Sequence, residues 1–242
     1  MVERAAKKSS AGFGEMIVAI LQAVALALVI RTLLFQPFSI PSGSMMPTLL
    51  VGDYVLVTKW SYGYTKYSLP LSPNLFEGRI WASEPERGDV LVFRKPSETD
   101  VDFIKRLIGL PGDRVQMRDG VLYINGTAVP REPEGFFVEG NGVQVPQYRE
   151  TLPNGVTYLT LDKANTMADN TREFVVPAGH YFMMGDNRDN SDDSRGSVGY
   201  VPFENLIGKA QLIFFSIDGD WALKFWKWPE ELRLNRFFTW IR

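Results

Sequence analysis

Three short segments of this 242-residue chain carry side chains that could do chemistry. The first reads Pro-Ser-Gly-Ser-Met-Met-Pro over residues 41–47. A nucleophilic serine needs an exposed hydroxyl on a fixed backbone, with hydrogen-bond donors near the oxyanion that develops. Ser42 and Ser44 bracket a glycine that lets a substrate carbonyl approach closely, and the flanking prolines stiffen the segment. The alternative is a serine-glycine linker, although two methionines are unlike a flexible linker.

The second segment reads Asp-Phe-Ile-Lys-Arg-Leu-Ile-Gly over residues 102–109. On a strand, the side chains of Phe103, Lys105 and Leu107 share one face. Two large apolar neighbours lower the pKa of a lysine, because burial disfavours the charged form. A neutral lysine can act as a general base. The alternative is an exposed lysine in a basic strand beside Arg106.

The third segment, residues 185–195, is dense in Asp, Asn, Ser and Arg side chains. Such a segment can form a rigid hydrogen-bonded network that orients a base, or it can be a solvated turn. A calcium-loop register starting at Asp189 places serine and tyrosine where that loop needs glycine and glutamate. We therefore predict no metal ion and no cofactor.

Composition excludes several other chemistries. The chain has no cysteine, which excludes thiol catalysis, disulfides and cysteine-ligated metals. Its one histidine, His180, excludes sites with two histidine ligands and allows a Ser-His-Asp triad only through that residue. We predict a structural role for His180. A net charge of −2 argues against a nucleic-acid partner.

These segments must be positioned by a chain whose first 50 residues contain a long apolar run at 16–35. Twenty helical residues span about 30 Å, the thickness of a bilayer core. The run predicts a transmembrane anchor; a cleaved signal peptide and a buried amphipathic helix are the alternatives. Three basic residues precede the run, Arg31 lies near its end, and no lysine or arginine follows Phe35 until Lys59. The positive-inside rule then places residues 1–15 in the cytoplasm and the residues after Phe35 outside it.

After the apolar run the pattern predicts a mainly β fold. Apolar and polar residues alternate in residues 51–60 and 88–95. Asp119-Gly120 and Asn125-Gly126 are typical of hairpin turns, and the second also matches a glycosylation acceptor with Thr127. Residues 131–170 are rich in Gly, Pro, Asn and Glu, which indicates a loop-rich outer lobe.

The chain resembles bacterial type I signal peptidases, also called leader peptidases. The similarity covers the apolar run, PSGSMMPTL, GDVLVF, DFIKRLIGLPGD and GDNRDNSDDSR, in the order of that family. It implies a coiled antiparallel β-sheet catalytic lobe, residues 36–117 and 178–242, and an inserted lobe, residues 118–177. It also implies a single-pass endopeptidase of the inner (plasma) membrane, with its catalytic domain on the outer side. The implied partners are the lipid bilayer and the signal peptides of exported preproteins, cut after Ala-X-Ala.

The resemblance also implies roles for individual residues. Ser44 corresponds to the nucleophile and Lys105 to the general base. Ser42 corresponds to a donor in the oxyanion hole, and Ser191 to a hydrogen-bond partner of the lysine. The supporting polar network corresponds to Asp186, Asp193 and Arg195. The residues that match substrate-pocket positions are Phe38, Ile40, Met45, Leu49, Phe103 and Ile104.

Other functions and one segment remain open. Another Ser/Lys protease, such as a self-cleaving repressor, would lack the membrane run. A membrane-tethered β protein with a degenerate site would not need every dyad position. The segment Trp221–Arg242 holds four of the six tryptophans among basic residues, and suits either a membrane interface or a packed terminus.

Overall fold

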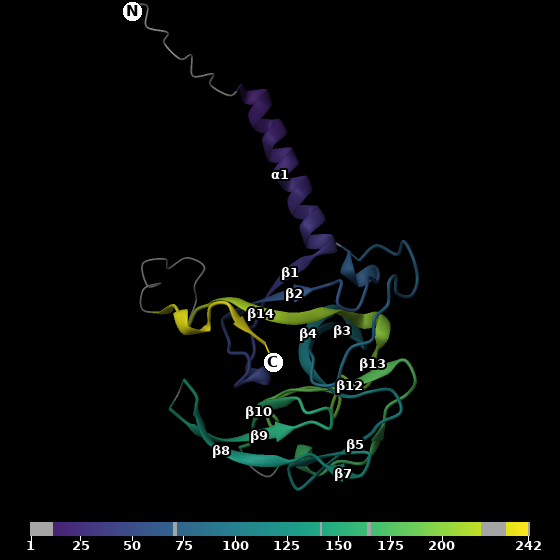
Figure 1. Ribbon diagram of the computed structural model, residues 1–242, viewed down its shortest axis with the longest axis vertical. Helices are drawn as coiled ribbons and strands as arrows, with labels where there is room; N and C mark the ends of the chain where they lie inside the picture. Colours follow the sequence, from purple (N-terminus) through teal and green to yellow (C-terminus); the bar gives the residue numbers. More distant parts are fainter. Residues whose placement is uncertain (1–11, 70–71, 141, 164–165, 219–230, 242) are drawn as a thin grey trace, which may run out of the picture.

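The structure, a computed structural model, describes residues 12–69, 72–140, 142–163, 166–218 and 231–241. An isolated helix, α1 (Phe13–Leu33), projects from a body made of β-sheets (Figure 1). Its mean hydropathy is 2.3 and none of its side chains is buried, so it is long and apolar enough to cross a membrane. The helix begins at Phe13, before the predicted start of the span at residue 16. It ends at Leu33, before the predicted end at residue 35, because Phe35 already pairs with Thr58 in the sheet.

The largest sheet carries the chemically interesting segments. Its strands run β1-β2-β14-β3-β4-β12-β13, with β15 paired to β14, and every pairing is antiparallel. Register shifts in the β14 pairings mark bulges, which bend and twist strands. The mainly β prediction is confirmed. The bounds are β1 (Phe35–Ser39), β2 (Asp53–Thr58), β3 (Val90–Lys95), β4 (Glu98–Gly109), β12 (His180–Met184), β13 (Val201–Pro202), β14 (Leu206–Ser216) and β15 (Thr239–Trp240).

Two smaller sheets form the end of the body opposite α1 (Figure 1). One has the order β11-β5-β6-β7 and begins at Arg114, just before the predicted lobe boundary; the other has the order β10-β9-β8. Their bounds are β5 (Arg114–Arg118), β6 (Val121–Ile124), β7 (Thr127–Ala128), β8 (Arg131–Val138), β9 (Gln144–Thr151), β10 (Thr157–Leu161) and β11 (Phe174–Val175).

The region predicted as loop-rich, residues 131–170, therefore contains a three-stranded sheet. Most side chains of β8 are exposed, so the strand shows no alternation of apolar and polar residues. Its backbone still pairs with β9 along its length. Strand pairing that depends on backbone hydrogen bonds rather than on a buried face leaves little signal in the sequence.

The predicted hairpin turn at Asn125-Gly126 is confirmed. Both residues have positive φ angles, 54° and 80°, as a type I′ turn requires. The Asn125 side chain accepts a hydrogen bond from the Arg114 N–H at 2.9 Å and donates one to Asp113 at 2.8 Å. These bonds tie the hairpin to the start of its sheet.

Alternate residues of β4 face two different hydrophobic clusters, as expected for a strand. Ile104 packs against a cluster that includes Ile40, Met45 and Leu49. Phe103 packs against a second cluster that includes Leu107. Strand β4, in the interior of the sheet, thus brings the lysine segment next to the Ser44 segment.

The terminal segment is described only in part, because residues 219–230 and 242 lie outside the described ranges. A short helix, η7 (Leu234–Arg236), leads to β15, which pairs with β14, and Trp240 on this strand is exposed. The described portion therefore forms an edge strand of the main sheet. His180 opens β12, where its Nδ1 lies 2.9 Å from the Ala178 carbonyl oxygen.

Candidate active site

Ser44 and Lys105 are brought into direct contact. Lys105 Nζ donates a hydrogen bond of 2.7 Å to Ser44 Oγ, across 61 positions of sequence. Ser44 lies in the single turn η1 (Gly43–Met45), and Lys105 lies in β4. Both residues are buried, so the hydroxyl of Ser44 is not the exposed group expected from the sequence. Its turn is covered by the lysine strand and by the segment after β12.

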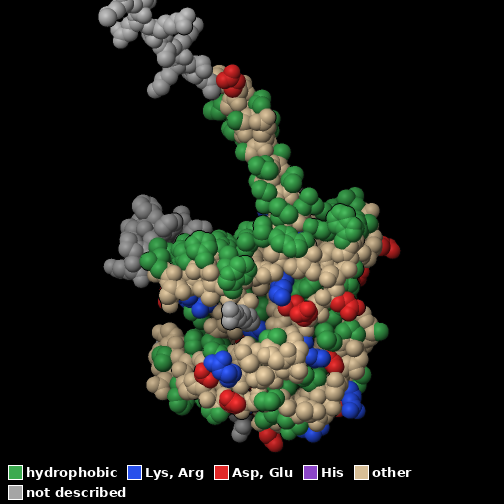
Figure 2. Space-filling view, in the orientation of Figure 1, with side chains coloured by type: hydrophobic (Ala, Val, Ile, Leu, Met, Phe, Trp, Pro, Cys, Tyr) green, Lys and Arg blue, Asp and Glu red, His purple; other side chains and the backbone are tan. Residues whose placement is uncertain are grey.

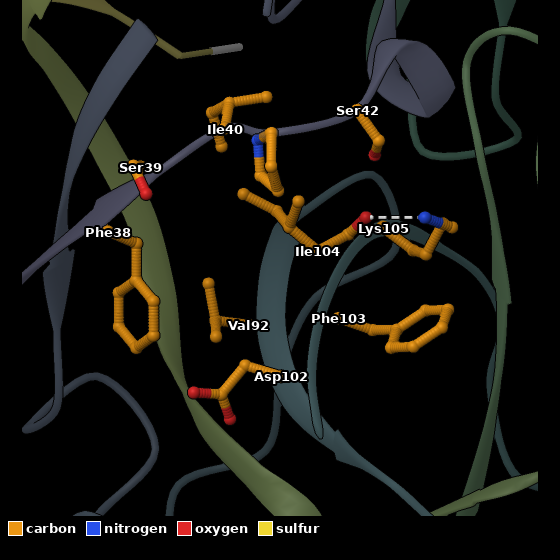
Figure 3. A pocket seen from close by; sticks show the side chains of 10 residues that line it. Phe38, Ser39, Ile40, Ser42, Val92, Asp102, Phe103, Ile104 and Lys105 are labelled. Atoms are coloured by element: carbon orange, nitrogen blue, oxygen red, sulfur yellow. Dashed lines mark hydrogen bonds between the residues drawn. The ribbon is translucent and has the colours of Figure 1, made fainter. Parts of the chain in front are cut away.

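The surroundings of Lys105 favour its neutral form. Burial lowers the pKa of Lys105 to about 8, although Asp193, Asp192 and Asp186 oppose this shift. Nζ lies 5.2 Å from the centre of the Phe103 ring and donates a hydrogen bond of 3.0 Å to the Ile104 carbonyl oxygen (Figure 3). A lysine with this pKa is about half neutral at pH 8, whereas an ordinary lysine is almost entirely charged.

Ser42 lies beside the pair on the exposed rim. Its Oγ is 3.5 Å from Ser44 Oγ. The residue precedes η1 in an extended conformation, at φ −130° and ψ 155°. Its hydroxyl can therefore reach the same space as Ser44 Oγ, where an oxyanion would form during attack.

Ser191 is close to the Ser44 turn but has no hydrogen-bond partner for its buried hydroxyl. A methyl group on Gly185 would lie 2.3 Å from Ser191 Oγ and 2.5 Å from the Ser44 carbonyl oxygen. Only glycine fits there, because any side chain would separate the two segments. The hydrogen bond to Lys105 that the resemblance implied is not formed in this structure.

Asp186 is the acceptor of a buried ion pair next to the dyad. Arg106 donates to its two oxygens from Nε at 2.8 Å and Nη2 at 2.7 Å, and Thr48 Oγ1 donates at 2.6 Å. Arg106 follows the lysine on β4, and Thr48 follows the serine turn. The Asp186 carboxylate therefore links the lysine strand to the segment after the serine turn. Of these three residues, the sequence analysis anticipated only Asp186.

Asp193 and Arg195 form a second buried pair. Arg195 donates from Nε at 3.0 Å and Nη2 at 2.8 Å, and the Gly185 N–H donates at 3.0 Å. Burial would raise the pKa of Asp193, but the charge of Arg195 and these hydrogen bonds hold it below its usual value. The pair stays ionised and folds the 185–195 segment back on itself.

Asn187 holds the nucleophile turn and was missed by the sequence analysis. Its backbone N–H donates to the Ser44 carbonyl oxygen at 3.1 Å, and its Nδ2 donates to the Gly43 carbonyl oxygen at 3.0 Å. The residue is fully buried. The only available signal was its place in the polar segment, since an amide has no chemistry of its own to suggest a role.

A cavity of about 280 Å³ opens beside Lys105 (Figure 3). Four of the six predicted pocket residues line it: Phe38, Ile40, Phe103 and Ile104. Met45 and Leu49 do not, because both are fully buried in the core beneath it. The sequence analysis missed the other lining residues, Ser39, Pro41, Val92 and Asp102.

One edge of β4 is unpaired along this cavity. β12 pairs with β4 only at Arg106, Leu107 and Gly109, whereas β3 pairs with the other edge from Asp102 to Arg106. Among the strands that the structure describes, none covers the outer edge of Asp102–Lys105. An extended peptide could hydrogen-bond there as an added strand.

Comparison with known proteins identifies the family. A family model described as "Signal peptidase, peptidase S26" matches residues 13–215. The chain is 47% identical to signal peptidase I of Rickettsia typhi and 46% identical to that of Rickettsia prowazekii, each over 89% of both chains. A crystal structure of a signal peptidase I from Enterococcus faecalis shares 29% identity over 52% of this chain and 97% of that chain, with a TM-score of 0.33. From the family match and these identities, the chain belongs to the S26 signal peptidases and is a serine endopeptidase.

Proposed function

We propose that this chain is a membrane-anchored peptidase that removes signal peptides from exported preproteins through a Ser44–Lys105 dyad. The 2.7 Å contact between Lys105 Nζ and Ser44 Oγ carries this proposal. The family match supports signal peptides as the substrate class. The burial of Lys105, which lowers its pKa, supports its role as the general base.

The dyad would work by proton transfer to and from a neutral lysine. Lys105 Nζ accepts the Ser44 proton as Oγ attacks the scissile carbonyl, and the resulting ammonium then protonates the leaving amine. The same lysine activates water to hydrolyse the acyl-enzyme. Ser42 Oγ and the Ser44 backbone N–H would donate hydrogen bonds to the oxyanion. Asp186, Asp193 and Arg195 would hold the surrounding segments in place rather than contact substrate.

The cavity supports selection of small substrate side chains. An extended signal peptide pairing with Asp102–Lys105 would direct alternate side chains into the space beside Phe38, Ile40 and Ile104. The apolar side chains around this cavity would accept small apolar residues such as alanine. This geometry agrees with cleavage after Ala-X-Ala.

The arrangement of α1 supports a single membrane anchor, and the basic residues before it support a body on the outer side. The helix projects from one end of the body, and apolar side chains cover that same end (Figure 2). Exposed Trp60 packs edge-on against Phe35, directly after the helix. A catalytic site in a body held against the membrane in this way would meet a substrate whose own signal helix lies in the bilayer.

The test is cleavage of a preprotein by the purified full chain in detergent. Ser44→Ala should abolish cleavage in a protein that remains folded, because Ser44 Oγ is the only hydroxyl hydrogen-bonded to Lys105 Nζ among the residues that the structure describes. Ser83→Ala, at an exposed serine away from the cavity, is the matched control and should cleave normally. Near wild-type turnover by a folded Ser44→Ala protein would refute the proposed dyad.

A further inference from the structure

Three polar side chains form a buried cluster between the three-stranded sheet and the segment 185–195. Glu150 on β9 and Tyr158 on β10 lie directly opposite each other, and Arg188 belongs to the segment. Arg188 donates two parallel hydrogen bonds to Glu150, from Nη1 to Oε1 at 2.8 Å and from Nη2 to Oε2 at 2.6 Å. The Tyr158 hydroxyl donates to Glu150 Oε2 at 2.7 Å and accepts from Arg188 Nη2 at 3.0 Å. We refer to these three residues as the Glu150 cluster.

The Glu150 cluster is an ion pair completed by a neutral phenol. The side chains of Arg188 and Glu150 are only 2% and 1% exposed. Burial alone would lower the pKa of Arg188, but the charge of Glu150 raises it above its ordinary value. Burial and the charge of Glu150 raise the pKa of Tyr158, so its hydroxyl keeps the proton that it donates. Two parallel bonds between a guanidinium and a carboxylate fix both the distance and the direction of the contact.

One side of the cluster reaches the Ser44 turn through the backbone. Arg188 directly follows Asn187, whose N–H donates to the Ser44 carbonyl oxygen at 3.1 Å. The Arg188 N–H donates to the carbonyl oxygen of Leu161, the last residue of β10, at 2.9 Å. The side chain and the backbone of Arg188 therefore both attach the segment that holds Ser44 to the three-stranded sheet.

The other side of the cluster reaches the lysine strand through Tyr158. The guanidinium carbon of Arg106 lies 4.2 Å from the centre of the Tyr158 ring, which is a cation–π distance. Arg106 directly follows Lys105 on β4 and is fully buried. The ring of Tyr158 therefore supports the residue next to the lysine, while its hydroxyl is bonded to the rest of the cluster.

The cluster is better explained by the geometry that it imposes than by stability. Burying an ion pair costs desolvation that the attraction of the two charges barely offsets, and apolar residues of similar size are often as stable. Its three side chains are not among the residues that line the cavity beside Lys105. The cluster therefore acts on the reaction only through the segments that it joins.

We propose that Glu150 and Tyr158 are positioning residues, a role that rests on the proposed catalytic dyad. The one cluster supports both members of the dyad, Ser44 through the segment 185–195 and Lys105 through its neighbour Arg106. A displacement of about 1 Å between reacting groups can lower a rate by about 10²-fold. The three-stranded sheet thus contributes to catalysis without contacting substrate.

The test compares two ion pairs of the same geometry on the same sheet. Glu134 on β8 and Arg149 on β9 form an exposed pair with two parallel bonds, of 3.0 and 2.6 Å. In the full chain in detergent, Glu150→Gln should lower kcat for preprotein cleavage by about 10²-fold and keep KM within about threefold, because it disturbs the reacting atoms rather than substrate binding. Glu134→Gln should leave both constants unchanged. A wild-type kcat in folded Glu150→Gln, or a change in KM alone, would overturn the proposal.

A second variant separates positioning from stability. Glu150→Leu, Tyr158→Phe and Arg188→Met together replace the cluster with apolar side chains, so that no buried charge is left unpaired. We expect a Tm near that of the wild type and a kcat still lowered by about 10²-fold, because apolar contacts do not fix the direction of the segment. Recovery of the wild-type kcat together with the Tm would overturn the proposal. This variant also carries the test if Glu150→Gln does not fold.

Two further measurements complete the test. Tyr158→Phe keeps the ring on Arg106 and removes only the hydroxyl, so kcat should fall by about fivefold to tenfold at unchanged KM. An unchanged kcat would overturn the role of Tyr158. Ser44→Ala separates this proposal from that of the dyad: cleavage by folded Ser44→Ala refutes the dyad itself. Loss of cleavage in Ser44→Ala, with normal cleavage by Glu150→Gln, refutes only the positioning role.

Discussion

Two regions of this molecule bury a lysine in similar ways, and only one of them can perform proton transfer to a nucleophile. Burial lowers the pKa of both Lys105 and Lys59 to about 8. Lys105 Nζ contacts a serine hydroxyl, whereas Lys59 Nζ donates to the carbonyl oxygen of Ser68. A carbonyl oxygen has no proton to give. The difference shows that burial lowers the pKa of a lysine, but the atom that its Nζ contacts decides whether the lysine can act as a general base.

The second region has a structural explanation. Lys59 follows β2, and its backbone N–H donates to the Leu34 carbonyl oxygen after α1. Arg31, near the end of α1, further lowers the pKa of Lys59, and Asp102 opposes that shift. Lys59 therefore fastens the base of the helix to the main sheet, and its lowered pKa follows from burial and from the charge of Arg31.

Replacing each lysine by methionine should give the largest difference between the two regions. Lys105→Met should lower kcat by at least about 10³-fold, within the range lost with a general base. Lys59→Met should keep turnover within about tenfold, because Lys59 contacts no reacting group. Preprotein cleavage by the folded proteins measures both. A comparable loss in both variants would break the distinction drawn here.

Removing a neighbouring hydroxyl should give the next largest effect. Ser42→Ala should lower kcat by about 10²–10³-fold, since it deletes one oxyanion donor. The control is Ser61→Ala near Lys59, where the hydroxyl bonds only to Thr58 at 2.6 Å. Single-turnover cleavage separates this loss from weaker substrate binding. An unchanged rate for Ser42→Ala would remove Ser42 from the oxyanion hole.

The pH dependence of cleavage should report Lys105 alone. Its pKa of about 8 predicts that log(kcat/KM) falls by about one unit for each pH unit below that value, because the protonated lysine cannot accept the Ser44 proton. Lys59→Met should leave this limb in place. The profile would contradict the assignment if activity stayed constant from pH 8 down to pH 6.

Stability should show the smallest contrast, because burial is the main cause of the lowered pKa of both lysines. A lysine with a pKa lowered from 10.5 to about 8 binds fewer protons in the folded state, so folding stability rises between about pH 8 and 10.5. Each methionine substitution should flatten that rise to a similar extent. Thermal unfolding across this pH range measures the effect. Flattening by only one substitution would show that the two lysines are not buried alike.

Much of the architecture could be predicted from local pattern. Alternation marked β2 and β3, the positive-φ pair Asn125-Gly126 marked a hairpin, and continuous apolar character marked α1. These features depend on neighbouring residues and so are visible in a single sequence. The strand β8 was missed because its side chains are mostly exposed, although its partner β9 is the next strand in the chain.

The candidate site divides in the same way. Residue type and sequence motif identified Ser44, Lys105 and Asp186, because the chemistry of hydroxyl, amine and carboxylate groups is evident from residue type alone. Arg106 and Asn187 were missed, since their roles arise only from contacts with segments more than 50 residues away. Met45 and Leu49 lie in the core beneath the cavity rather than in its lining, and their pocket role stays a prediction, because apolar residues beside a site can line it or support it from below.

The sequence by itself determined the chemical inventory: a serine flanked by glycine, a lysine between apolar residues, no thiol, one histidine and an apolar span. Tertiary structure decided which of these groups meet. It placed Ser44 against Lys105 and left Lys59 against a carbonyl oxygen. The physical reason is that hydrogen bonds and charge interactions act over a few ångströms, and the pairing of distant strands sets which groups come that close.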